Sequence, residues 1–158
     1  MTKKIGLISD THGLLRPEAI AALQGTDLII HAGDVGRLDI LAELQTIAPV
    51  VAIRGNVDTD DWATELPDTA IAKVNGESIY VIHDLHDGAI DTAASGCRMV
   101  VSGHSHQPGQ TERDGVLYVN PGSAGPRRFR LPVTIALVDV SETEWRVSFV
   151  ELLHSILK

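Results

Sequence analysis

The sequence predicts an α/β fold in which a sheet-on-sheet core is covered by helices. In the first third of the chain, short apolar segments rich in β-branched residues alternate with segments whose apolar residues recur at helical spacing. This order is typical of right-handed βαβ units, whose strands pair in parallel. Farther along, an Asn-Gly turn signal and two terminal segments of alternating apolar and polar residues indicate antiparallel pairing.

Length and composition limit the functions that the chain can have. It has 158 residues, enough for one domain with a proper core, and we treat residues 1–158 as a single domain. The formal net charge of −8 argues against general binding to nucleic acid or anionic membranes. No apolar run approaches the roughly 20 residues of a membrane helix, and the start does not resemble a signal peptide. The lone Cys97 cannot form an intrachain disulfide, so we expect a cytoplasmic protein.

The first part of the chain predicts three strands and two helices. Pro17 suits the first position of a helix that ends at Gly25, and Pro49 ends a second, amphipathic helix. Each predicted strand is a short apolar run of the kind that is buried on both faces of a parallel sheet. The strands cover residues 4–9, 27–31 and 50–53, and the second helix covers residues 38–48.

The remainder predicts further strands and one short helix. A polar loop over residues 57–65 follows the third strand. Asn75-Gly76 favours a tight type I′ turn, so the segments on either side are expected to form a hairpin. The predicted strands cover residues 69–74, 78–82, 98–102, 115–119, 133–140 and 145–152, and the helix covers residues 89–94.

Residues that can bind a metal stand where five of these strands end. Sites in open α/β sheets form outside the carboxyl ends of the strands, so we expect these side chains to meet in one crevice. Turns and caps explain an aspartate or an asparagine individually, but they do not explain four histidines at strand ends. The seven residues are Asp10, His12, Asp34, Asn56, His83, His104 and His106.

The chemistry of this set predicts two divalent metal ions. Two carboxylates, one amide and four imidazoles are too many ligands for one ion but suit two, and a carboxylate can bridge the pair. Two neighbouring metals are a recurring device for displacement at phosphorus. Nitrogen and oxygen ligands without thiolate favour manganese, with iron, zinc, nickel or cobalt as alternatives. Both ions would polarise the phosphoryl oxygens, and a bridging hydroxide would attack in line.

The same residues, taken with their neighbours, form five motifs whose order and spacing carry a family resemblance. The motifs are Asp10-x-His12, Gly33-Asp34, Gly55-Asn56, the strand-ending His83 and Gly103-His104-Ser105-His106. They resemble the calcineurin-like metallophosphoesterase family from Ile5 to about Ser123. The segment from Asn120 to Ser123 is similar to the small bacterial and archaeal phosphodiesterases of that family. The resemblance implies a four-layer αββα sandwich of two mixed β-sheets flanked by helices.

The resemblance also implies roles for the ligands. Asp34 would bridge the two ions, and Asp34, Asn56 and His104 are the residues to which we assign a direct part in catalysis. Asp10, His12 and His106 would hold the first metal, and Asn56, His83 and His104 would hold the second.

One position departs from the family pattern. In relatives that act on phosphoproteins a histidine follows the asparagine and can serve as general acid, whereas Val57 follows Asn56 here. Valine cannot transfer a proton. Protonation of the leaving group must then come from water or another side chain, or not be needed, and good leaving groups would be favoured. Nearby, Asp58 is expected to cap a turn and Asp84 to orient an imidazole from outside the ligand set.

Other polar residues have two interpretations. His31 lies within an apolar strand, and we expect a core histidine bonded to the backbone rather than a ligand. His86 and Arg127 are candidate substrate contacts, since the planar guanidinium matches phosphate oxygens. A solvated loop explains His86 as well, and a solvated loop or a subunit contact explains Arg127.

The leading hypothesis is a dinuclear metal-dependent phosphodiesterase that hydrolyses a small phosphoester. One alternative is a non-catalytic scaffold of the same fold, similar to a retromer-coat subunit, although such scaffolds typically lose metal-site histidines. A nuclease is the other, although the chain lacks the basic groove that a long polyanion favours. Family resemblance alone implies self-association, as a dimer or tetramer.

Overall fold

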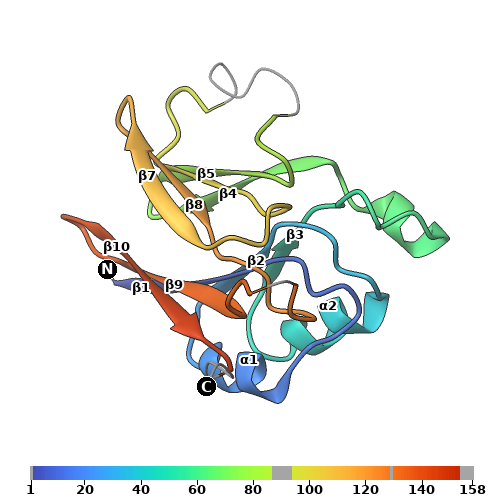
Figure 1. The fold of residues 1–158 in the computed structure, drawn as a ribbon. Helices are drawn as coiled ribbons and strands as arrows, with labels where there is room; N and C mark the ends of the chain where they lie inside the picture. The colour runs from blue at the N-terminus through green and yellow to red at the C-terminus, as the bar shows by residue number, and fades with distance from the viewer. Residues whose placement is uncertain (1, 87–93, 129, 154–158) are drawn as a thin grey trace.

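Two five-stranded sheets pack face to face in the computed structural model, which describes residues 2–86, 94–128 and 130–153 (Figure 1). The strand order is β10-β9-β1-β2-β3 in the first sheet and β4-β5-β6-β8-β7 in the second. The first sheet contains β1 (Lys3–Ile8), β2 (Leu28–His31), β3 (Val50–Ala52), β9 (Thr134–Val140) and β10 (Trp145–Glu151). The second contains β4 (Thr69–Val74), β5 (Glu77–Ile82), β6 (Met99–Val101), β7 (Gly109–Arg113) and β8 (Val116–Asn120).

The first sheet confirms the predicted βαβ units. β1, β2 and β3 pair in parallel, and β9 pairs antiparallel with β1 and with β10. The sheet is therefore mixed, and the carboxyl ends of its three parallel strands lie at one edge.

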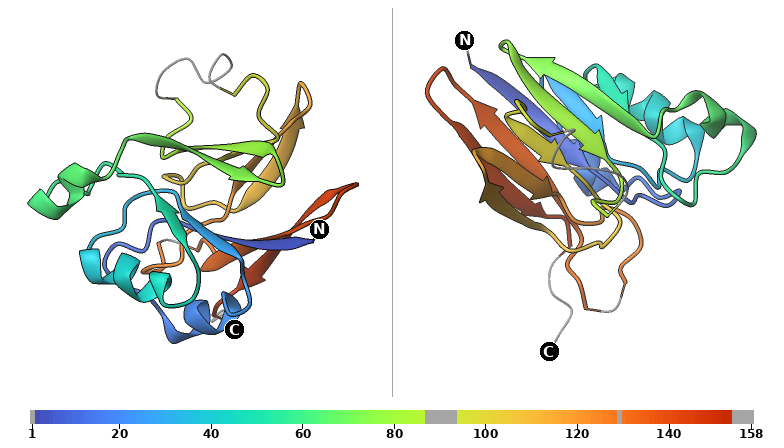
Figure 2. Two further views of the ribbon diagram at one scale, coloured as in Figure 1. Left: turned by 180° about the vertical axis from the view of Figure 1, so that it is seen from behind. Right: turned by 90° about the horizontal axis from the view of Figure 1, so that it is seen from above.

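Two helices cover the outer face of the first sheet: α1 (Pro17–Ala22) and α2 (Leu38–Gln45) (Figures 1 and 2). α2 buries Ile40 and Leu44 at helical spacing, in one cluster with Ile29 of β2. Gly6 of β1 is needed on this face, because a Cβ there would collide with the side chain of Leu23.

The second sheet contains the predicted hairpin. β4 and β5 pair through a turn in which Asn75 and Gly76 have φ values of 51° and 81°. This left-handed pair is typical of a type I′ turn. β5, β6 and β8 run parallel to one another.

The core lies between the sheets. Leu7 and Ile30 of the first sheet, and Ile79, Met99 and Val101 of the second, belong to one buried cluster. A further cluster covers part of the outer face of the second sheet. The packing of the two inner faces brings the carboxyl ends of the parallel strands of one sheet close to those of the other.

The prediction missed two elements. No strand was predicted over β7, because its residues do not alternate between apolar and polar; in the structure all five are exposed. The turn of Asp114 and Gly115, with φ values of 54° and 79°, was the available signal for this hairpin. The polar loop at residues 57–65 includes a short 3-10 helix, η1 (Asp61–Glu65).

The helical layer expected outside the second sheet falls on residues 89–94, nearly all of which lie outside the described residues. Within the described part of the chain, both α-helices cover the first sheet. None of the described helices has the length and apolar character that a membrane crossing requires.

Candidate metal centre

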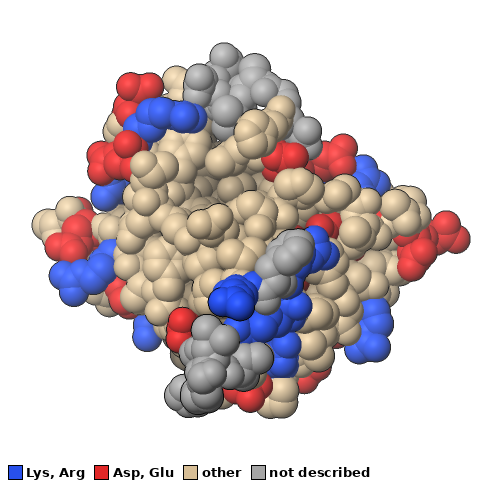
Figure 3. All heavy atoms as spheres, in the orientation of Figure 1, with Lys and Arg blue, Asp and Glu red and all other residues tan. Residues whose placement is uncertain are grey.

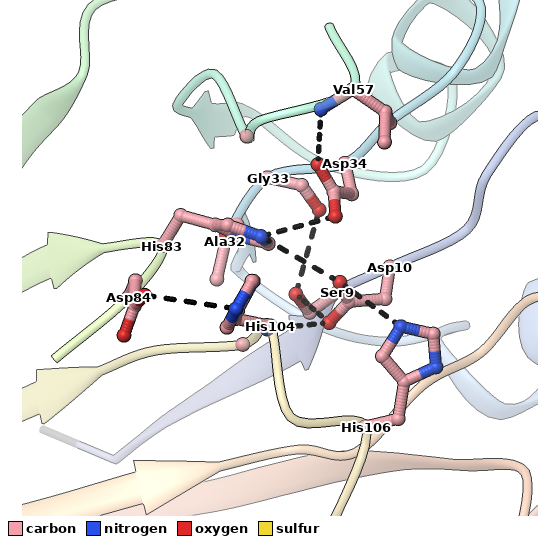
Figure 4. Close-up of polar contacts among 12 residues, drawn as sticks. Ser9, Asp10, Ala32, Gly33, Asp34, Val57, His83, Asp84, His104 and His106 are labelled. Atoms are coloured by element: carbon pink, nitrogen blue, oxygen red, sulfur yellow. Dashed lines mark hydrogen bonds and ion pairs between the residues drawn. The ribbon is translucent and has the colours of Figure 1, made fainter. Parts of the chain in front are cut away.

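The predicted ligands come from loops that leave the carboxyl ends of β1, β2, β3, β5 and β6, and six of them lie together in two groups. Figure 4 shows Asp10, Asp34, His83, His104 and His106 of this set. Within each group, one ligand atom from each residue lies within 4.8 Å of the other two. The groups are Asp10, His12 and His106, and Asp34, His83 and His104.

The first group is centred on one carboxylate oxygen. Oδ1 of Asp10 lies 3.8 Å from Nε2 of His12 and 3.6 Å from Nε2 of His106. The two imidazole nitrogens lie 3.3 Å apart. Metal bonds of about 2.0–2.2 Å place neighbouring ligand atoms roughly 3–3.5 Å apart, so this spacing suits a common ion.

The second group adjoins the first through both carboxylates. Oδ2 of Asp34 lies 3.1 Å from Nε2 of His83 and 3.6 Å from Nε2 of His12. Oδ1 of Asp10 lies 3.9 Å from the same nitrogen of His83. Asp34 is thus placed between the two groups, where a bridging carboxylate would stand.

Asn56 lies beside the second group. It lines a depression of about 510 Å³ together with His83, Asp84 and His104. The N–H of the next residue, Val57, donates to Oδ1 of Asp34 at 2.9 Å. This hydrogen bond links the loop that carries Asn56 to the side chain of Asp34 and so fixes the position of one relative to the other.

The ligand atoms fit a cation because Oδ1 of Asp10 is buried and has no hydrogen-bond partner among the described residues, and the buried Nε2 of His83 faces Oδ2 of Asp34 at 3.1 Å. The second oxygen of Asp10 accepts from Oγ of Ser9 at 2.8 Å and from the N–H of His104 at 3.0 Å. Nδ1 of His83 donates to the carbonyl of Ala32 at 2.7 Å. Each side chain is anchored through one atom and presents the other to the centre, a pattern typical of metal ligands.

Burial and charge shift the pKa values of these groups. Burial raises the pKa of Asp10 to about 7, although the charge of His83 opposes the shift. Burial also acts to raise the pKa of Asp34, but hydrogen bonds from His83 and the Val57 N–H outweigh it and lower the value to about 2. A cation would offset the cost of keeping both carboxylates charged.

The pKa values of the imidazoles shift in opposite directions. Burial lowers the pKa of His12 and, with the charge of Arg128, lowers that of His106 to about 4. Burial also acts to lower the pKa of His83, but the hydrogen bonds to Asp34 and Ala32 prevail and raise it to about 9. Neutral imidazole is the form that binds a metal, so the two imidazoles of the first group are held in their binding form.

The backbone at the centre is strained. Non-glycine residues rarely adopt positive φ, and such residues gather at functional sites. Among the described residues, the only others of this kind are Asn75 and Asp114 in the hairpin turns. The ligands with positive φ are Asp10 (56°), His12 (47°), Asp34 (57°), His104 (76°) and His106 (64°).

Close backbone approach requires glycine next to two ligands. A Cβ on Gly33 would lie 2.7 Å from Nδ1 of His83. A Cβ on Gly103 would collide with Oγ of Ser9, the anchor of Asp10. The glycines beside the ligands in the sequence are thus explained by packing.

Two buried side chains lock the loops that carry the ligands. His31 is fully buried, as expected of a core histidine. Its Nδ1 accepts from the Gly33 N–H at 3.1 Å, so Nε2 carries the proton and donates to Oγ1 of Thr11 at 3.0 Å. Asp58 does more than cap a turn: it accepts from the N–H groups of Val35, Gly36 and Gly55 at 3.0, 2.9 and 2.9 Å.

The last residue of β8 and the segment after it support the centre in a way that the sequence did not indicate. Nδ2 of Asn120 donates to the Gly103 carbonyl at 3.0 Å and to Oγ of Ser105 at 3.1 Å. Oγ of Ser123 donates to the carbonyl of Asp10 at 3.0 Å. The sequence shows that polar residues stand at this strand end, but it does not show which groups Asn120 and Ser123 bind.

The two candidate substrate contacts differ in placement. His86 is 94% exposed and is bonded to Asp84 beside the centre. Arg127 is half-buried, and it is the neighbouring Arg128 whose charge acts on His12 and His106. Positive side chains gather on the face that carries this loop (Figure 3).

Comparison with known proteins agrees with this geometry. The family sequence model of the calcineurin-like phosphoesterase superfamily domain matches residues 4–143 of this chain. The chain belongs to this superfamily. A probable metallophosphoesterase of Methanothermobacter thermautotrophicus is 35% identical over 145 residues, which cover 84% of each protein.

Solved structures share the phosphoesterase fold. A structure described as a novel archaeal phosphodiesterase has a TM-score of 0.77 and 26% identity, and covers 93% of this chain and 99% of its own. Vps29 of Chaetomium thermophilum has a TM-score of 0.76, covering 94% of this chain and 96% of its own. At 18% identity, the likeness to Vps29 shows the fold alone.

Proposed function

We propose that this phosphoesterase-family protein is a dinuclear metal-dependent phosphodiesterase that hydrolyses small phosphodiesters. The observation that carries the proposal is the pair of adjoining ligand groups with Asp34 between them. Family membership supports hydrolysis of phosphoesters in general, and the paired groups support the two-metal form of that chemistry.

The residues divide the work as follows. Asp10, His12 and His106 would hold one ion, Asn56, His83 and His104 the other, and Asp34 both. Divalent ions bound there would stabilise the charge of the phosphoryl oxygens and make water a nucleophile near neutral pH. Manganese is our first choice, with iron, zinc, nickel or cobalt as alternatives, because the ligands are imidazole, carboxylate and amide.

Residues around the ligands set the geometry. Ser9 and the His104 N–H hold Asp10 through the oxygen that faces away from the centre. The Val57 N–H holds Asp34 in the same way, while its side chain, 48% exposed, supplies no proton. Such preorganisation limits the reorganisation needed in the transition state.

The substrate is proposed to be small. The net charge of −8 disfavours a long polyanion, and the positive charge near the centre, that of Arg128, suits a single phosphoryl group. Arg127 and His86 remain proposed substrate contacts.

A cytoplasmic location is a further proposal, supported by the single buried Cys97. A homo-oligomeric state is also proposed, and it is supported by the family resemblance.

The test is hydrolysis of bis(p-nitrophenyl) phosphate by metal-free protein supplemented with manganese. We expect turnover that disappears on chelation and falls more than about 100-fold in Asp34→Ala and His104→Ala, with Asp139→Asn, a change at an exposed residue of β9, as the control. Full activity after chelation and in Asp34→Ala would contradict the proposal.

A non-catalytic scaffold of the same fold is the second candidate, and the likeness to Vps29 shows only that shared fold. All seven ligand residues are present in this chain, whereas a scaffold has no need of them. A scaffold would show no turnover with any of the metals named above.

A nuclease would hydrolyse single-stranded DNA faster than the small diester under the same conditions.

A further inference from the structure

A cavity of about 420 Å³ adjoins the metal centre on the side of His104. It lies between the segment after β5 and the β7–β8 hairpin. Its lining includes the uncharged side chains of Leu85, Pro108 and Tyr118. This volume is in the range of small-molecule sites and is sufficient for a ring-sized group.

His86 lines the same cavity as His104 and is joined to it through one carboxylate. Oδ1 of Asp84 lies 3.1 Å from Nδ1 of His86 and also accepts the His86 N–H at 3.0 Å. The other oxygen of Asp84 lies 3.6 Å from Nε2 of His104. Asp84 therefore fixes the tautomer and orientation of His86, whose side chain is 94% exposed and whose Nε2 is the ring nitrogen not bonded to Asp84.

A basic leaving group needs a proton donor other than the ligand residues, because carboxylates and imidazoles bind a metal in their deprotonated forms. Cleavage of the P–O bond leaves its electron pair on the leaving oxygen, which must be protonated unless the leaving group is a weak base. Val57, the residue after Asn56, has an aliphatic side chain that cannot transfer a proton. At the cavity, the amide of Asn120 is engaged by Gly103 and Ser105, and an amide is not an acid.

We propose that the cavity receives the leaving group of the diester and that His86, held by Asp84, protonates its oxygen. This rests on the proposed phosphodiesterase function. The proton passes from Nε2–H of the imidazolium to the leaving oxygen as the P–O bond breaks. The neutral imidazole keeps Nδ1–H toward Asp84 and regains its proton from solvent. Imidazole is the side chain best suited to this exchange near neutral pH.

The experiment compares two diesters that differ only in the leaving group, methyl p-nitrophenyl phosphate and methyl phenyl phosphate. p-Nitrophenolate is a weak base and leaves unaided, whereas phenolate is more basic and benefits from protonation. We expect His86→Ala to lose about 10²-fold in kcat on the phenyl ester and less than about threefold on the nitrophenyl ester. Asp84→Asn, a change in a positioning residue, should shift the ratio in the same direction by a smaller factor.

Imidazole added to His86→Ala should restore the rate on the phenyl ester, which a structural role for His86 would not allow. Glu112→Gln, an exposed change on β7 outside the cavity, should leave the ratio unchanged. An equal loss on both esters, an unchanged ratio or failure of the rescue would overturn the assignment of His86. If the wild-type protein hydrolyses neither ester with any metal, the proposed function itself fails, and this outcome is distinct from the others.

Discussion

At the scale of single residues, the centre depends on side chains that have two polar atoms and use one of them as an anchor. Asp10 and His83 both follow this pattern, with Oδ2 and Nδ1 bonded to the protein. The remaining oxygen of Asp10, Oδ1, is buried and makes no hydrogen bond within the described residues, while Nε2 of His83 faces Oδ2 of Asp34 at 3.1 Å. An unpartnered buried polar atom is costly, so a cation at Oδ1 of Asp10 has a stabilising effect beyond its charge.

His31 predicts a pH dependence of stability. Burial lowers its pKa from 6.5 to about 4, and Nδ1 accepts the Gly33 N–H, so the folded protein excludes the proton. Between about pH 6.5 and 4 the unfolded chain binds a proton that the folded chain does not. The free energy of unfolding should therefore fall as pH falls through this window, by up to about 3 kcal/mol.

Denaturant titrations between pH 8 and 4.5 measure this effect. His31→Gln should be less stable at pH 8, because its bonds to Thr11 and Gly33 are lost or altered, but should lose less stability on acidification than the wild type. Carboxylates titrate in the same window in both proteins, so the difference between the two slopes isolates His31. Parallel slopes would refute the assignment.

At the scale of elements, the loops after β1, β2 and β3 act as one unit. Residues far apart in sequence share backbone hydrogen bonds: the Asp10 N–H donates to the Gly33 carbonyl at 3.0 Å and the His12 N–H to the Asp34 carbonyl at 2.9 Å. Asp58 adds three charge-assisted bonds across the second and third loops. The strained ligands are therefore held by their neighbours, as such conformations require.

Asp58→Asn tests this clamp. The amide keeps the shape but removes the charge and replaces an acceptor oxygen with a donor facing N–H groups, so we expect the free energy of unfolding to fall by about 2–4 kcal/mol. We also expect weaker manganese binding, because Asp34 and Asn56 lose their common support. Asp60→Asn is the matched control, since Asp60 is exposed and its side chain caps no helix. Equal stability of the two variants in denaturant would count against the clamp.

At the scale of the whole molecule, the centre joins the two sheets. Asp10 and Asp34 follow strands of the first sheet, and His83 and His104 follow strands of the second. The ligand sets come together only when the sheets are packed on each other. Binding of metal should therefore favour the folded chain over the unfolded one.

Thermal unfolding with increasing manganese tests this coupling. A ligand that binds only the folded state at 100 times its dissociation constant adds about 2.7 kcal/mol, so we expect Tm to rise with metal concentration. The rise in Tm should be smaller in His83→Ala than in the wild type. In the control variant Asp139→Asn, a change at an exposed residue of β9, the rise should equal that of the wild type. A rise in Tm that is the same in His83→Ala would show that the metal binds elsewhere.

Much of the fold and most of the ligand set could be predicted from local pattern. Parallel strands follow from apolar runs separated by amphipathic helices, and the β4–β5 hairpin follows from Asn75-Gly76. β7 was missed because an edge strand with five exposed residues has no hydrophobic period. Its turn, Asp114-Gly115, was the better signal, because it depends on backbone conformation and not on burial.

The sequence by itself determined which residue types stand at strand ends, because that depends only on short-range pattern. The family resemblance implied the grouping of Asp10 with His106, 96 residues later, and the bridging place of Asp34, but it is the tertiary structure that brings these side chains together. The tertiary structure also decided that Asp58 clamps two loops and that His86 shares a cavity with His104. These relations depend on how two sheets pack, and packing is set by the whole core, so no local segment encodes them.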